Sequence, residues 1–161
     1  MSKFETSKSS GAHFNLSQMT GEWEGTTRTY FDESKVPVDE SPMHGTIKSI
    51  LGGRFMLHEY QGLMQGKPFE GVAIYGHHLD SEKFQCAWVD SYHMGTGILF
   101  SEDKQDNKLF SVLGSYGGGD ETWGWRTDIE MPDKDHLNII STNLTPQGEP
   151  AGGVQTNYIR K

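Results

Sequence analysis

The stretch Gly21-Glu22-Trp23-Glu24-Gly25 decides the fold, in combination with Arg160 close to the other end of the sequence. Trp23 lies between two glutamates, which is the alternation of a strand with one covered and one solvent-facing side. A Gly-x-Trp in the first strand and an arginine in the last strand are typical of small β-barrels that close one end with this pair. We expect the Arg160 guanidinium to stack on the Trp23 ring, a contact that contributes about 0.5–2 kcal/mol. The pair is assigned a structural role at the floor of a barrel, with direct ligand contact as the alternative.

Segments of period two continue from this stretch to the end of the chain, and no window keeps a helical period over three turns. The pattern predicts strands at residues 21–31, 43–51, 54–64, 68–79, 83–92, 96–102, 107–116, 122–131, 136–144 and 154–160. The breaks are short and rich in turn-forming residues, as at Gly52-Gly53 and between Asp103 and Asn107. Such short connections join antiparallel neighbours, and a meander of strands loses its free edges only when it closes. The sequence therefore predicts an all-β fold, an antiparallel up-and-down barrel of about ten strands.

The chain of 161 residues is long enough for one domain with its own core. We expect a flexible N-terminal segment at residues 1–15, which is rich in serine and lysine, and a single barrel domain at residues 16–161. A short helical turn is expected near residues 15–20, where Phe14, Leu16 and Met19 would plug a barrel end.

Charge and composition argue against several classes of function. The 14 Lys and Arg residues face 22 Asp and Glu residues, and the net charge of −8 argues against a nucleic-acid partner. No stretch approaches 18 apolar residues, so no membrane span is expected, and the single Cys86 rules out an internal disulfide. The N-terminal residues lack the apolar segment of a secretion signal, and a cytoplasmic monomer or homodimer is expected.

Alternation also selects the side chains that face the barrel interior. On strand 54–64 the choice is open, because either Phe55, Leu57 and Glu59 or Met56, His58 and Tyr60 could face inward. On the other strands, the inward faces mix aromatic rings with polar groups such as Asp90. A core built for stability alone seldom buries such groups, whereas a partly hydrated cavity accommodates them. A barrel of about 8 to 10 strands is wide enough to hold one small ligand.

The favoured function is non-catalytic binding of a small, largely apolar or aromatic molecule in this cavity, whose volume should exceed about 300 Å³. The expected apolar wall consists of Phe55, Leu57, Phe69, Tyr75, Trp88, Leu99 and Leu113. The polar end of the ligand is expected to meet Glu59, Asp90, Arg126 and Tyr158. Asp90 has a structural alternative, in which it pairs with Arg126 or Arg54.

Two other functions remain open. The cavity could house an enzyme in which Asp90 or Glu59 acts as acid or base, with His77 or His93 within hydrogen-bond reach as its partner. Alternatively, a solid barrel could bind other proteins through an exposed apolar patch. A metal site would need His58, His77 and His93 to converge with Asp90, and since no compact ligand spacing is present, no metal is expected.

Several motifs together resemble one known family, DUF1579, whose function is uncharacterised. The matching segments are Gly21–Gly25, Leu51-Gly52-Gly53-Arg54-Phe55 with Glu59-Tyr60, Pro68–Gly71, Trp88–Ser91 with Gly95-Thr96-Gly97, and Tyr158–Lys161. The resemblance covers the chain from about Leu16 to its end and implies a lipocalin-like (calycin) barrel. More remotely, the pattern is similar to nitrobindin-type barrels, which bind haem through a histidine close to the C-terminus. The last strand here contains no histidine, so haem is not expected.

Overall fold

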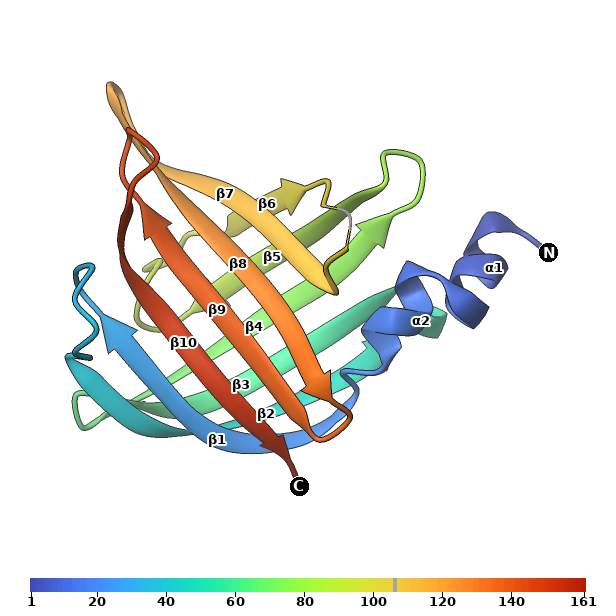
Figure 1. Ribbon diagram of the computed structural model, residues 1–161, viewed down its shortest axis with the longest axis horizontal. Coiled ribbons are helices and arrows are strands. Elements are labelled where there is room, and N and C mark those ends of the chain that lie inside the picture. Colours follow the sequence, from blue (N-terminus) through green and yellow to red (C-terminus); the bar gives the residue numbers. More distant parts are fainter. Residues whose placement is uncertain (106) are drawn as a thin grey trace.

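The structure is a computed structural model that describes residues 1–105 and 107–161. Within them, ten antiparallel strands form one closed barrel with helices at one end (Figure 1). The strands are β1 (Gly21–Tyr30), β2 (Asp39–Ile50), β3 (Phe55–Met64), β4 (Lys67–His78), β5 (Lys83–Asp90), β6 (Leu99–Asp103), β7 (Phe110–Gly118), β8 (Glu121–Asp133), β9 (His136–Leu144) and β10 (Pro150–Arg160). The helices are α1 (Lys3–Ser10), α2 (Ala12–Ser17) and the 3₁₀ turn η1 (Leu51–Gly53). The predicted up-and-down barrel is confirmed, while residue 106, in the predicted turn from Asp103 to Asn107, lies outside the described residues.

Closure of the barrel joins β1 to β10, the strands that lie furthest apart in the sequence. In this register Trp23 pairs with Arg160, and Gly25 pairs with Tyr158. A Cβ added to Gly25 would overlap the backbone carbonyl of Asn157, so only glycine lets the two strands approach this closely. The second glycine of the opening stretch is therefore required by barrel closure rather than by a turn.

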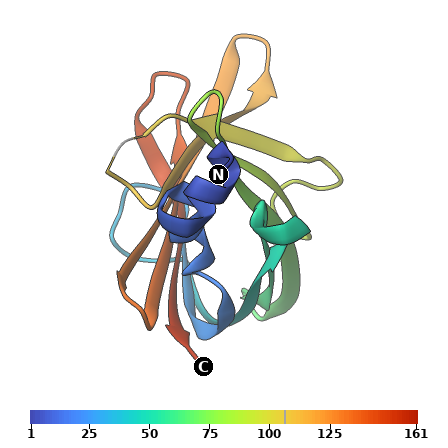
Figure 2. The same ribbon diagram turned by 90° about the vertical axis from the view of Figure 1, so that its right-hand side faces the viewer.

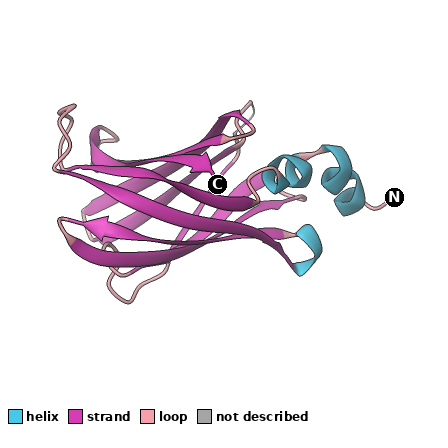
Figure 3. Cartoon of the chain, turned by 90° about the horizontal axis from the view of Figure 1, so that it is seen from below, coloured by secondary structure: helices cyan, strands magenta, loops and turns pink. Residues whose placement is uncertain are grey.

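The floor of the barrel is the end at which α1 and α2 lie (Figures 2 and 3). Leu16 and Met19, in α2 and just after it, are fully buried there. Phe14 is 43% exposed, so the prediction that it belongs to the plug is wrong, because α2 turns this side chain toward solvent. Trp23 Nε1 donates a hydrogen bond to the Met19 carbonyl at 2.9 Å, and the Arg160 guanidinium lies 4.3 Å from the Trp23 ring centroid. The expected stacking is present, and it ties the turn after α2 to β1 and β10.

Residues 1–15, expected to be flexible, contain α1 and the first turn of α2. Ser2 caps α1 by accepting a hydrogen bond from the Glu5 N–H, and Ser7 is hydrogen-bonded to His13 of α2 at 2.8 Å. These contacts describe structure and not motion, so the expected flexibility of residues 1–15 stays a prediction. No helix in residues 1–105 and 107–161 is long and apolar enough to cross a membrane.

The opposite end of the barrel, which we call the mouth, is bounded by turns between strands (Figure 3). Here β6 has 5 residues, and its described residues pair with β7 through Ser101–Gly114 and Glu102–Leu113. Residues 91–98, between β5 and β6, form the adjoining rim. Since few backbone hydrogen bonds hold this part of the wall, we expect it to open at lower free energy than the rest of the barrel.

Candidate functional site

The barrel interior contains a cavity of about 80 Å³ between the middle of the barrel and the mouth. Its lining combines aromatic rings with hydroxyl groups and consists of Thr27, Met43, His58, Tyr60, Phe69, Ala73, Tyr75, Cys86, Trp88, His93, Leu99, Ser101, Trp125, Thr127, Ile139, Ser141, Val154, Thr156 and Tyr158. We call this space the interior cavity. Because its polar side chains are largely buried, each of them needs a hydrogen-bond partner in the protein or in a bound molecule.

His58 of β3 occupies the centre of the polar lining. Its Nδ1 lies 2.9 Å from the Tyr75 hydroxyl of β4, and its Nε2 lies 2.9 Å from the Tyr158 hydroxyl of β10. Complete burial lowers the pKa of His58 to about 3, so the imidazole is neutral near pH 7. Burial likewise raises the pKa values of Tyr75 and Tyr158, which keeps both phenols protonated. The three side chains form a neutral hydrogen-bonded unit across the barrel.

A second polar contact links β3 to β5. Trp88 Nε1 donates a hydrogen bond to the Tyr60 hydroxyl at 2.7 Å. Burial raises the pKa of Tyr60, so this phenol also stays protonated. The Tyr60 hydroxyl lies against Gly71, and a Cβ added to this glycine would overlap the hydroxyl oxygen. Glycine at this inward position of β4 therefore makes the room in which the Tyr60 hydroxyl is seated.

An aromatic cluster lies at the mouth end of the interior cavity. Trp88 of β5 and Trp125 of β8 stack with ring centroids 5.7 Å apart and an interplanar angle of 6°. The His93 ring lies 5.4 Å from the Trp88 ring and 6.0 Å from the Trp125 ring. These three rings come from β5, β8 and the segment after β5, and they line the part of the interior cavity that faces the mouth.

Asp90 fixes the position of His93. Its fully buried carboxylate accepts a hydrogen bond from His93 Nδ1 at 2.5 Å and others from the backbone N–H groups of Tyr92 and His93. Burial alone would raise the pKa of Asp90, but these hydrogen bonds outweigh it and hold the pKa below its usual value. Since Nδ1 is held by the carboxylate, Nε2 is the nitrogen of His93 that remains for a ligand.

The structure places five of the predicted ligand-binding residues on the interior cavity: Phe69, Tyr75, Trp88, Leu99 and Tyr158. Asp90 is buried beside the cavity and contacts it through His93. Its expected partners are elsewhere, because Arg54 lies over the Phe4 ring on the helical side and Arg126 bonds to Asp103.

The open choice on β3 is decided in favour of Met56, His58 and Tyr60, which face inward. The prediction that Phe55, Leu57 and Glu59 line the ligand site is therefore wrong. Phe55 covers Gly76 on the outer wall, and Glu59 forms an exposed ion pair with Lys48 at 3.5 Å. Leu57 shares this outer face. Neither side chain set could be preferred from the alternation alone, since both contain apolar and polar residues.

Leu113 and Arg126 also point outward, contrary to prediction. On β7 the buried positions that pack into the core are Phe110 and Val112, which leaves Leu113 36% exposed. On β8 the inward position beside Arg126 is taken by Trp125, and Arg126 instead bonds to Asp103 at 3.0 Å. Trp125 was missed as a site residue, although the spacing of Trp123 and Trp125 on one strand is a signal for a shared face.

The histidines considered for a metal site do not converge. His77 lies at the helical end, with its ring 6.1 Å from His13 and 4.9 Å from Phe84, far from the His93–Asp90 pair at the mouth. His58 is held by two tyrosines in the middle of the barrel. Across the described ranges, no three or more His, Cys, Asp and Glu side chains are arranged to hold a metal ion. The buried Cys86 has a pKa raised by burial to about 12, which leaves a protonated, unreactive thiol.

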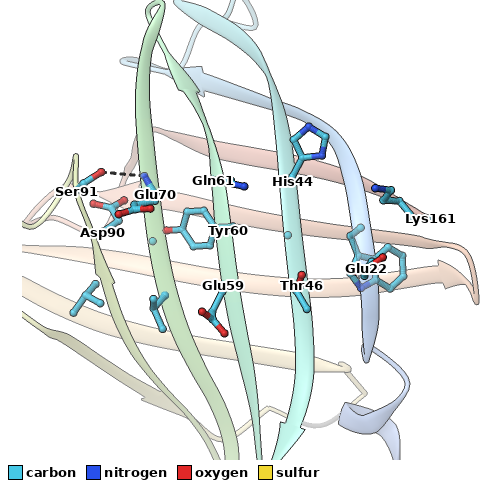
Figure 4. A pocket seen from close by; sticks show the side chains of 15 residues that line it. Glu22, His44, Thr46, Glu59, Tyr60, Gln61, Glu70, Asp90, Ser91 and Lys161 are labelled. Atoms are coloured by element: carbon cyan, nitrogen blue, oxygen red, sulfur yellow. Dashed lines mark hydrogen bonds between the residues drawn. The ribbon is translucent and has the colours of Figure 1, made fainter.

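A larger hollow of about 690 Å³ lies on the outer face of β1 to β5 (Figure 4). Its lining includes the charged or titratable residues Glu22, His44, Glu59, Glu70 and Lys161. This groove is broad and open to water, so its exposed charged groups are hydrated and need no further partner, while the buried Asp90 at its edge is already bound to His93. We take the interior cavity as the candidate site because its polar groups are buried.

The comparisons with known proteins agree with this architecture. The model of the family described as protein of unknown function DUF1579 matches residues 8–160. The chain belongs to the DUF1579 family. The family resemblance inferred from the motifs is therefore confirmed.

A solved structure shares the fold of this DUF1579 barrel. An S-type phycobiliprotein lyase, CPES from Guillardia theta, is 10% identical, with a TM-score of 0.54 over 92% of this chain and 90% of that one. A de novo designed fluorescence-activating β-barrel is 11% identical, with a TM-score of 0.48 over 91% of this chain and 98% of that one. No curated protein matches the sequence.

Proposed function

We propose that this DUF1579 barrel binds a small, largely apolar or aromatic molecule that enters the interior cavity through the mouth. The observation that carries the proposal is the cavity itself, an unfilled space bordered by aromatic rings and by buried hydroxyl groups. A barrel stabilised only by its core would fill this space with side chains, because an unfilled interior forfeits packing energy. Apolar walls with a few converging polar groups are the usual composition of a small-molecule site.

The volume of about 80 Å³ limits what the cavity accepts without rearrangement. The sequence-based expectation of more than about 300 Å³ is therefore wrong, and the cavity holds only a few non-hydrogen atoms. A larger ligand must separate Trp88 from Trp125, which are joined by a stacking contact worth about 0.5–1.5 kcal/mol. The short β6 next to this pair gives the wall room to move. We therefore expect the two indoles to act as the entrance.

Native mass spectrometry of the protein isolated from its own host is the direct test. A small molecule released on denaturation supports the proposal and gives the ligand's mass. The matched experiment is calorimetric titration with acetophenone of the wild type, Trp125→Ala and Leu113→Ala. Trp125→Ala enlarges the entrance and should strengthen or accelerate binding, whereas Leu113→Ala changes only the outer wall. Absence of a released molecule together with absence of saturable binding in all three proteins would reject the proposal.

The Asp90–His93 pair favours a second candidate, an enzyme that uses His93 Nε2 as a general base. In this reaction a proton leaves the carbon next to a carbonyl for Nε2, and the electron pair moves onto the carbonyl oxygen. Glu59 and His77 are no longer candidates for the acid, the base or its partner, because neither lines the interior cavity. Exchange of the acetophenone methyl protons in D₂O, followed by NMR, tests this candidate. Exchange that is faster than in buffer and lost in His93→Gln supports it, and equal rates in both proteins exclude it.

A further inference from the structure

We infer that the polar part of the interior cavity recognises a neutral hydrogen-bond acceptor, the carbonyl oxygen of an otherwise apolar ligand. The inference rests on the proposed function and adds the chemical class of the ligand. It follows from counting hydrogen-bond donors and acceptors among the buried side chains that line the cavity.

The unit around His58 has one donor more than it uses. A neutral imidazole carries one N–H and one acceptor nitrogen, and each of Tyr75 and Tyr158 carries one O–H. These three protons serve two hydrogen bonds, at His58 Nδ1 and at His58 Nε2. Whichever tautomer His58 adopts, the tyrosine that accepts the imidazole N–H keeps a hydroxyl proton that no described residue accepts.

Tyr60 contributes a second unused donor. The indole N–H of Trp88 can only donate, so the direction of the Trp88–Tyr60 hydrogen bond is fixed. The Tyr60 oxygen is the acceptor, and its own O–H proton has no acceptor among residues 1–105 and 107–161. Tyr60 is half-buried and also lines the outer hollow, whereas Tyr75 and Tyr158 are buried. A buried hydroxyl donor without a partner is unfavourable, so the spare proton of the His58 unit is the one that most favours a ligand with an acceptor, and Tyr60 adds a second donor beside it.

The charge around the cavity selects a neutral acceptor over a carboxylate. The described side chains that line it include no lysine or arginine. Arg126 is bound to Asp103 on the outer face, and Arg160 lies over Trp23 at the floor. At the mouth, the negative charge of Asp90 adjoins His93. An anion placed here would be buried without a free cation, which is strongly unfavourable, whereas a carbonyl oxygen brings no charge.

Acetophenone, α-methylstyrene and benzoate test the inference, because they are similar in size and differ at the polar group. Calorimetry on the wild-type protein gives the three affinities. The ratio of the acetophenone and α-methylstyrene affinities is compared with the ratio of their cyclohexane–water partition coefficients, which removes the difference in hydration. If the hydroxyl protons bind the carbonyl, the ratio of the acetophenone affinity to the α-methylstyrene affinity exceeds the ratio of their partition coefficients by about tenfold or more. Benzoate should bind more weakly than acetophenone.

The outcomes separate the inference from the proposed function. Binding of acetophenone and α-methylstyrene in the ratio of their partition coefficients would overturn the inference and leave the proposed function standing. Tighter binding of benzoate than of acetophenone would also overturn the inference alone. If none of the three probes binds, the inference is overturned, and the proposed function is rejected with it only when native mass spectrometry also releases no molecule.

Infrared spectroscopy of bound acetophenone supplies an independent readout. Hydrogen bonding should lower its C=O stretching frequency relative to that in cyclohexane, and an unshifted band would overturn the inference. Tyr60→Phe should change the frequency of the bound band. Tyr116→Phe is the matched control, because Tyr116 bonds to Asn143 and does not line the interior cavity. Equal frequencies in the wild type and both variants would overturn the role of Tyr60.

Discussion

The buried neutral His58 makes a quantitative prediction for stability as a function of pH. In the folded chain its pKa is lowered to about 3 by burial, from 6.5 for an unperturbed histidine. Between these two values the unfolded chain binds a proton at this residue and the folded chain does not. Acidification therefore favours unfolding, and the stability that is fully present above about pH 6.5 declines as the pH falls toward 3.

The expected magnitude follows from the size of the shift. Each pH unit below 6.5 costs about 1.4 kcal/mol of unfolding free energy for one such group. At pH 4.5, two units below the unperturbed value, the loss attributable to His58 is about 2.7 kcal/mol. This is a large fraction of the roughly 5–15 kcal/mol that stabilises a typical domain.

The assay is urea unfolding followed by tryptophan fluorescence at several pH values between 7.5 and 4.5, on the wild type and on His58→Gln. Burial also lowers the pKa values of His13 and His77, and these residues contribute with the same sign. Both remain in the variant, so the difference between the two pH profiles isolates His58. Three tyrosines face His58, namely Tyr60, Tyr75 and Tyr158, and all three stay neutral over this range because burial raises their pKa values. Parallel profiles for the two proteins would refute the reasoning.

Two further predictions concern the closure of the barrel. Arg160→Ala removes the stacking on Trp23 and the guanidinium hydrogen bonds to backbone carbonyls, and should cost about 2–3 kcal/mol in urea unfolding. Lys48→Ala, which removes only an exposed ion pair to Glu59, is the control and should cost less than about 1 kcal/mol. Equal effects of the two substitutions would contradict the structural role of Arg160. Gly25→Ala places a methyl group on a backbone carbonyl of β10 and should unfold the protein or lower its melting temperature by more than about 10 °C. Gly118→Ala is the control, because the added Cβ has no atom within 4 Å and should leave the melting temperature nearly unchanged. A Gly25→Ala variant as stable as Gly118→Ala would show that β1 and β10 are not packed as described.

Several features of the candidate site were accessible from the sequence because they depend on one strand or one turn. Phe69, Tyr75, Trp88, Leu99 and Tyr158 reach the interior cavity as alternation predicts, since the large aromatic and aliphatic side chains of their strands recur at every second residue. The Asp90–His93 pair was also within reach, because the two residues are three apart and a turn brings them together.

The part of the site that the sequence left open depends on strand register. On β3, Phe55 and Leu57 compete with Met56, His58 and Tyr60, and a shift of one residue exchanges the two faces. Register is decided by neighbours: His58 faces inward because Tyr75 and Tyr158, 17 and 100 residues away in the chain, supply its hydrogen bonds.

Period-two alternation, short turns and the Trp23–Arg160 pair were thus sufficient to determine the barrel, because strand pairing between sequence neighbours is local and closure is the arrangement that leaves no edge. The tertiary structure alone decided which polar groups meet inside it. Partners for a buried hydroxyl or imidazole come from strands across the barrel, and the hydrogen bonds between them depend on distances that no single segment specifies.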